Sequence, residues 1–167
     1  GPETYIESYY KGPKDNLMYT TNCTEVYMRG EEGAISTPPR IQLINEDIKS
    51  SARTGWDGLF WQKQYKAFID YFQEKELEPY FETLDSLTRL MANVSYEHQG
   101  RRIEGMRMQN LGDAYMVNGW EAMPYDNHSG IVDIYRNPKG DISRLAYYNQ
   151  QLYVAVASRN QVVKLPG

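Results

Sequence analysis

The chain has 167 residues, 41% of them hydrophobic and 24% charged, which is typical of one folded globular domain rather than a disordered chain. A net charge of −4 argues against a nucleic-acid-binding surface, because phosphate binding needs a basic face. No stretch approaches the length of a membrane span, and with two histidines and one cysteine we expect no metal site, no internal disulfide and no cofactor.

The first half of the chain is predicted to run from strands into helices. Residues 17–21 and 24–28 have the composition of short strands. A helix is expected after Pro38-Pro39, since a first helical turn needs no amide donors, and helical spacing of apolar residues continues it to about residue 51. Aromatic residues at helical intervals predict a second helix over 59–75. Thr83 is a good N-cap for a third helix, whose inner face we expect to hold Leu84, Leu87, Met91 and Val94.

The second half is predicted to return to strands. Residues 114–120 read as a short buried strand, "PYDNHSG" as a polar loop, and "GIVDIYRNPKGD" as a short strand that runs into a turn. Residues 152, 154 and 156 are apolar and alternate with their neighbours, which indicates β-structure near the end. Helices long enough for crossovers lie between the strands, so the order predicts a parallel α/β architecture with an all-β piece that begins near residue 148.

Two predicted strands end in residues that suit a sugar site. Glu31-Glu32 closes the first, and Trp120-Glu121 closes the second. Reacting groups of parallel α/β folds gather at the carboxyl ends of strands, where a carboxylate can attack an oxocarbenium-like centre while an indole packs on the ring. Other interpretations stay open. A Glu-Glu pair is most often on the solvated surface, Trp120 can belong to a core, and His128 can be a loop residue that makes only local hydrogen bonds.

Several segments share a pattern with one enzyme family. "RRIEGMRMQNLGDAYMVNGW" has Ile-Glu, two residues and Arg, followed by a strand that closes on Trp, and "GIVDIYRNPKG" and "AYYNQ" come after it. This stretch resembles the end of the catalytic domain in glycoside hydrolase family 2, which contains β-galactosidases, β-mannosidases and β-glucuronidases. Upstream, "RGEEGAISTPP" is similar to the family's nucleophile segment. The match puts Glu31 at the nucleophile and Glu32 where an aromatic residue usually stands, and it leaves the choice between the two acids open.

The resemblance implies a fold and an activity. Residues 1–147 would be the C-terminal portion of a TIM (β/α)8 barrel, and residues 148–167 would start a following β-sandwich domain. The activity would be a retaining β-glycosidase that acts on carbohydrate by double displacement, with Glu31 or Glu32 as the catalytic carboxylate. Trp120, Glu121 and His128 would bind substrate. The family's acid/base follows an asparagine on an earlier strand, whereas Asn45-Glu46 here falls in a predicted helix.

The isolated chain is therefore expected to be inactive. A barrel takes about 250 residues, so we expect this piece to need the remainder of a longer polypeptide, or self-association, for stability. The sugar and its linkage stay open, and the compartment does too, with a periplasmic or secreted location slightly favoured. The alternative hypothesis is a non-catalytic carbohydrate-binding or structural module, in which Trp120, Trp56 or Trp61 would hold the glycan.

Overall fold

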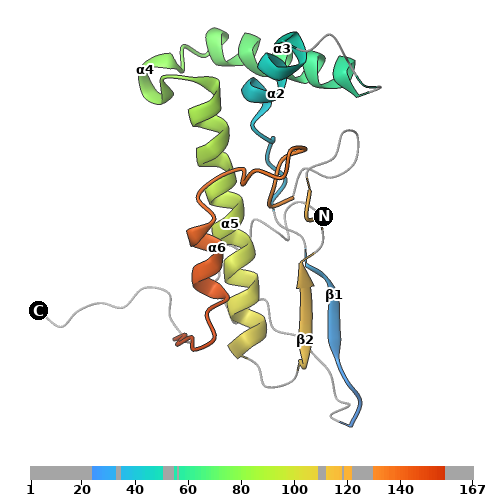
Figure 1. Ribbon diagram of the computed structural model, residues 1–167. Helices are drawn as coiled ribbons and strands as arrows, with labels where there is room; N and C mark the ends of the chain where they lie inside the picture. The colour runs from blue at the N-terminus through green and yellow to red at the C-terminus, as the bar shows by residue number, and fades with distance from the viewer. Residues whose placement is uncertain are drawn as a thin grey trace, which may run out of the picture. The chain divides into compact units, whose positions relative to one another are not determined.

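The computed structural model describes residues 24–32, 35–50, 55, 57–108, 112–117, 119–121 and 130–156 of the chain. These residues are mostly helical (Figure 1), and their elements in chain order are β1 (Met28–Glu32), α2 (Ile41–Ser50), α3 (Gly58–Glu74), α4 (Glu78–Phe81), α5 (Leu84–Met108), β2 (Ala114–Val117) and α6 (Ser143–Tyr148). The chain divides into two compact units: a first unit of Gly1–Ile35, Glu97–Asn118 and Ser143–Gly167, and a second unit of Ser36–Tyr96 and Gly119–Ile142. Helix α5 contributes residues to both.

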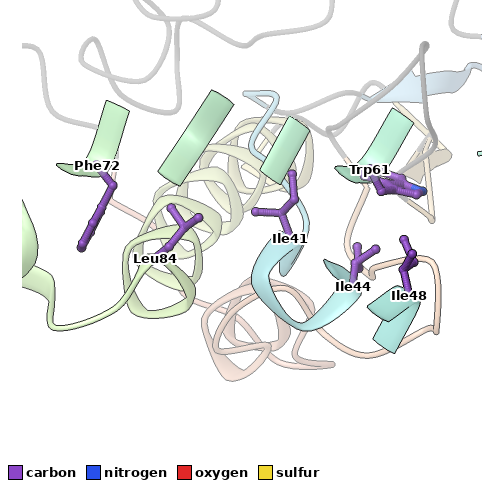
Figure 2. Packing of buried hydrophobic residues seen from close by; sticks show 6 residues of the cluster. All are labelled: Ile41, Ile44, Ile48, Trp61, Phe72 and Leu84. Carbon is purple, nitrogen blue, oxygen red and sulfur yellow. The ribbon is translucent and has the colours of Figure 1, made fainter. Parts of the chain in front are cut away.

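The second unit is built on an apolar core between helices. Three isoleucines of α2 recur every three or four residues and so form one stripe along the helix. Figure 2 shows this stripe with Trp61 and Phe72 of α3 and with Leu84, the first residue of α5. Each of these side chains is at least nine-tenths buried, and burying a side chain of this size contributes about 1.5–3 kcal/mol. The predicted helices over 41–51 and 59–75 are thereby confirmed to within one or two residues.

The start of α5 follows from its capping residue. The helix begins at Leu84, and the hydroxyl Oγ1 of Thr83 accepts a hydrogen bond from the amide of Ser86 at 3.1 Å. This bond satisfies one of the amides that a helix start leaves without a partner. The predicted cap is therefore confirmed. The predicted inner face is right for Leu84, which is 1% exposed, and wrong for Val94, which is 48% exposed.

The first unit contains a two-stranded parallel sheet. Strands β1 and β2 pair with Met28 opposite Ala114 and Glu32 opposite Val117. Parallel neighbours cannot be joined by a tight turn, and here the chain between them runs through helices α2 to α5. Figure 1 shows the two arrows side by side. The predicted strand over 24–28 is wrong except at Met28, because β1 covers Met28–Glu32. The predicted strand over 114–120 is confirmed for Ala114–Val117 but it is not buried, since Met116 is 54% exposed. Residues 17–21 lie outside the described part.

Helix α6 packs on the second half of α5 through a glycine. A Cβ added to Gly100 would overlap the ring of Tyr148, so the ring lies directly on the backbone of α5. The hydroxyl of Tyr148 donates to Oε2 of Glu97 at 2.7 Å, and Arg107 Nη1 donates to the carbonyl of Tyr148 at 2.6 Å. Gly100 is thus a residue of close helix packing rather than a helix break, and α5 runs through it without interruption.

The expected barrel portion and sandwich strand are wrong. Within the described residues the only sheet has two strands, of five and four residues, and helices make up most of the rest. Residues 153–156 form no strand: Leu152, Val154 and Val156 are each at least 80% exposed, while Tyr153 and Ala155 are partly buried. The alternation in the sequence therefore reflects an extended segment that packs one side against the protein and pairs with no strand of the described residues. The domain boundary expected between residues 147 and 148 stays a prediction.

The packing at Gly100 gives a testable prediction. Replacing a helical glycine with alanine ordinarily stabilises a helix by about 1 kcal/mol, but Gly100→Ala should destabilise the chain by about 1–3 kcal/mol because the new methyl group overlaps the ring of Tyr148. Urea unfolding of Gly100→Ala, Tyr148→Leu and the double variant measures the coupling. The cost of Gly100→Ala should fall sharply in the Tyr148→Leu background. An equal cost in both backgrounds would show that the two residues are not in contact.

Candidate functional site

The acidic end of β1 lies at one edge of the sheet. Glu32 is the last residue of the strand and is opposite Val117, the last residue of β2, with an irregularity in the register between Arg29 and Glu32. Since the strands are parallel, their carboxyl ends lie at the same edge, which is where ligands bind in open parallel sheets. The backbone brings Glu31 and Glu32 to this edge. Their side chains are outside the described part, so their role stays a prediction.

Trp120 has a fixed backbone and an exposed side chain. Its carbonyl accepts hydrogen bonds from the amides of Ile131 and Val132, at 2.9 and 3.0 Å. These two bonds hold the residue against the segment that follows the polar loop. The residue nevertheless remains 61% exposed. A large aromatic ring in water on a fixed backbone is available to a ligand, so the interpretation of Trp120 as a core residue is wrong.

Glu121 is anchored more loosely. Its backbone forms a bridge with Val132, and its Oε2 lies 3.9 Å from Nε of Arg136. Both side chains are substantially exposed, so this pair contributes at most about 1 kcal/mol. Arg136 has a positive φ of 66°, and an arginine in this left-handed region is held there by the surrounding turn. Trp120, Glu121 and Arg136 belong to the second unit.

The structure brings together part of the predicted set. Trp120 and Glu121 are neighbours in the second unit, and Glu31 and Glu32 belong to the first. His128 lies outside the described residues, as does Trp56. Trp61 is fully buried, and its indole Nε1 donates to Asp57 at 3.2 Å. The hypothesis that Trp61 could hold a glycan is therefore wrong.

Residues of the "IEGMR" motif contact the segment that follows α6. Glu104 is buried on α5, and its Oε1 accepts a hydrogen bond of 2.6 Å from the hydroxyl of Tyr153. Arg101 Nη1 lies 3.4 Å from the other carboxylate oxygen of Glu104. The guanidinium of Arg107 stands 5.2 Å from the centre of the Tyr153 ring, within cation–π range. Glu104 and Arg107 thus fasten the segment after α6 to α5.

Residues of the "VDIYRNPK" motif build a tight turn. Asp133 is 1% exposed, and its Oδ1 accepts hydrogen bonds from the amides of Tyr135 and Asn137, both at 2.9 Å. The amide of Asp133 donates to the carbonyl of Asn137, so the side chain and the main chain close the same loop. The hydroxyl of Tyr135 reaches Oδ2 of Asp47 on α2 at 2.5 Å. The motif therefore ties the turn to the helical core of the second unit.

Three tyrosines have the same kind of electrostatic environment. Burial raises the pKa of Tyr148 and Tyr153 well above the ordinary value, and the hydrogen bonds to Glu97 and Glu104 raise each pKa further. Tyr135 behaves in the same way beside Asp47. A carboxylate that accepts a hydrogen bond from a phenol disfavours the phenolate. Each of these hydroxyls is therefore held in its protonated form as a donor to its carboxylate.

Two classes of feature are not found within the described part of the chain. No group of three or more histidine, cysteine, aspartate or glutamate residues there has the arrangement of a metal site. None of the helices described is both long enough and apolar enough to cross a bilayer.

Comparisons with protein-family models, with curated protein sequences and with solved structures found no significant match to the chain. The resemblance to glycoside hydrolase family 2 therefore rests on the motifs in the sequence.

The structure adds interactions that were not predicted from the sequence. Arg102 on α5 is only 9% exposed, although arginine is mostly an exposed residue type. The pairing of Tyr148 with Glu97 and of Tyr153 with Glu104 was not predicted either. A signal for it exists, because Glu97, Gly100, Arg101 and Glu104 share one face of a helix at spacings of three and four.

The Tyr153–Glu104 bond gives a second prediction. Tyr153→Phe removes the donor and leaves a buried carboxylate oxygen without it, which should cost about 1–3 kcal/mol in the free energy of unfolding. Tyr147→Phe is the matched control, because Tyr147 is 53% exposed and its edge-on contacts with the rings of Tyr148 and Tyr153 do not need a hydroxyl. The control should change stability by less than about 0.5 kcal/mol. Equal effects of the two changes in urea unfolding would contradict a structural role for the bond.

Proposed function

We propose that this chain is a section of a retaining β-glycosidase and that it supplies the catalytic nucleophile, Glu31 or Glu32. Support comes from two sources. The sequence motifs resemble those of glycoside hydrolase family 2, and the acidic pair stands at the carboxyl end of a strand in a parallel sheet. The proposal does not need a complete barrel within this chain.

The parallel register of β1 and β2 is the observation that carries the proposal. Had the strands been antiparallel, Glu32 would lie opposite the start of β2. In the parallel register Glu32 is opposite Val117, so the acidic pair stands at the edge of the sheet where β2 also ends. A carboxylate at that edge is in the position from which enzymes with parallel sheets act on their substrates.

The proposed chemistry is a double displacement. The carboxylate oxygen of the nucleophile bonds to the anomeric carbon while the bond to the leaving oxygen breaks and a second carboxylic acid protonates that oxygen. Water, deprotonated by the same second group, then cleaves the glycosyl-enzyme ester and regenerates the nucleophile. The two carboxyl groups must stand about 5–5.5 Å apart. We expect the second group to come from another part of a longer polypeptide or from another chain, since Glu46 of the Asn45-Glu46 pair is an exposed residue of α2.

A second candidate function is carbohydrate binding without hydrolysis. The exposure of Trp120 favours it, because a ring that is 61% exposed on a fixed backbone can stack on a pyranose without any catalytic group. In this case Glu31 and Glu32 would be surface residues. Titration with oligosaccharides would then quench tryptophan fluorescence in the wild-type chain and not in Trp120→Ala, with no release of reducing ends.

A kinetic test separates the two functions. Glu31→Gln or Glu32→Gln, made in the parent polypeptide, should lower kcat on aryl β-glycosides by about 10⁴-fold or more, the range seen when a hydrolase loses a catalytic group. Glu25→Gln is the matched control, since Glu25 is an exposed residue just before β1, and it should keep near-normal activity. All three variants should unfold at the urea concentration of the parent. Near-normal turnover by both Glu31→Gln and Glu32→Gln would overturn the assignment of the nucleophile.

A further inference from the structure

Lys139 is a lysine inside the second unit. Only 1% of the residue is exposed, although lysine is among the residue types least often buried. Its Nζ donates a hydrogen bond of 2.8 Å to the carbonyl of Thr37. Thr37, Pro38 and Pro39 are buried as well and form the connection that leads into α2. The side chain therefore spans from the 130–140 segment to the connection before α2.

The backbone around Lys139 is fixed from a third element. The hydroxyl oxygen of Tyr96, on α5, accepts hydrogen bonds from the amides of Lys139 and Gly140, at 3.0 and 3.3 Å, and the same hydroxyl donates to the carbonyl of Ile131. The amide of Lys139 also reaches that carbonyl, at 3.2 Å. Helix α5, the connection before α2 and the 130–140 segment thus meet at Lys139. The amine of this lysine has little freedom to move toward water while the three segments stay together.

The charge of the amine decides whether this arrangement is favourable. Removing an ammonium ion from water costs several kcal/mol unless close opposite charges offset it. A neutral amine avoids most of that cost and can still donate to a carbonyl. Burial is the cause of the lowered pKa of Lys139, which falls from 10.5 to about 7. The buried arrangement therefore favours the neutral amine over the ammonium form.

Other titratable groups surround the site. Asp133 comes from the same segment, Tyr96 from α5, and Arg40 from the connection, where it forms a salt bridge of 2.7 Å with Asp85. The pKa of Arg40 is raised by Asp85, and burial raises the pKa of Tyr96, so neither group titrates between pH 7 and 9. This window also lies above the ordinary range of histidine.

We propose that Lys139 is a pH-sensitive latch that fastens the 36–40 connection to the 130–140 segment, closed by its neutral amine and loosened when the amine takes up a proton. The inference goes beyond the proposed function and does not depend on it. Its consequence is local: on acidification the connection that follows the acidic end of β1 opens more often. The sign follows from linkage, since the open form binds the proton more tightly than the closed form.

Hydrogen exchange at the amides of residues 139 and 140 tests the latch between pH 7 and 9. After correction for the intrinsic exchange rate, the opening constant should rise by up to about tenfold for each unit that the pH falls, and level off near pH 7. Lys139→Met should abolish this dependence, and Lys139→Arg should open readily at every pH because a guanidinium keeps its charge. Lys66→Met, at an exposed lysine paired with Asp70, is the control and should keep the wild-type slope.

A second measurement does not depend on whether the variants fold. The ¹³Cε resonance of Lys139 in the unmodified chain should titrate near pH 7, while the exposed lysines titrate near their ordinary value of about 10.4. Titration of Lys139 with the exposed lysines would overturn the proposal, as would an opening constant for residues 139 and 140 that is independent of pH in the wild-type chain.

Discussion

Helix α5 is the element on which the described structure depends most. Its first half holds the second unit: Leu84 closes the apolar core, and the hydroxyl of Tyr96 gathers the amides of the 130–140 segment. Its second half holds the first unit, because Gly100 receives the ring of Tyr148 and Glu104 binds Tyr153. Several polar side chains of this helix are buried alongside its apolar ones. Such an arrangement fixes specific neighbours, since a buried polar group is costly unless its own partner is in place.

Local patterns in the sequence were sufficient for the three longest helices, whereas the short helices α4 and α6 were not predicted. The isoleucines at helical spacing in 41–48, the aromatic residues across α3 and the hydroxyl of Thr83 each reflect contacts within a few residues. Helices α2 and α3 were therefore predicted nearly to their ends, and α5 was predicted at its start. The β-structure depends on contacts with distant residues, so it was predicted less well. The alternation at 152–156 is present, but no strand lies beside it in the described residues, where Tyr153 instead binds Glu104 of a helix. A barrel was inferred from the pattern of strands and helices, but the described part of the chain has only two short parallel strands.

The candidate site was likewise predicted only in part from the sequence. Glu31-Glu32 stands at a strand end and Trp120 is exposed, and the roles of these residues stay predictions. The roles of Glu104, Asp133 and Lys139 could not be read from the motifs, because a motif does not say which side of a turn or helix faces the protein interior. Each of the three is buried and bonded within the fold. Family motifs that look functional can therefore be conformational, and here they fix turns and connections within each unit.

The parallel register of β1 and β2 is the central claim, because it places the acidic pair at the edge where β2 ends. Cysteines introduced at Met28 and Ala114, with Cys23 replaced by serine, test it by disulfide formation under mild oxidation. Paired positions on adjacent strands are within the Cα separation of about 4.4–6.8 Å that a disulfide accepts. We predict rapid cross-linking of this pair and little for cysteines at Met28 and Val117, which lie at opposite ends of the ladder. Preferential cross-linking of Met28 with Val117 would indicate an antiparallel pair and would contradict the account.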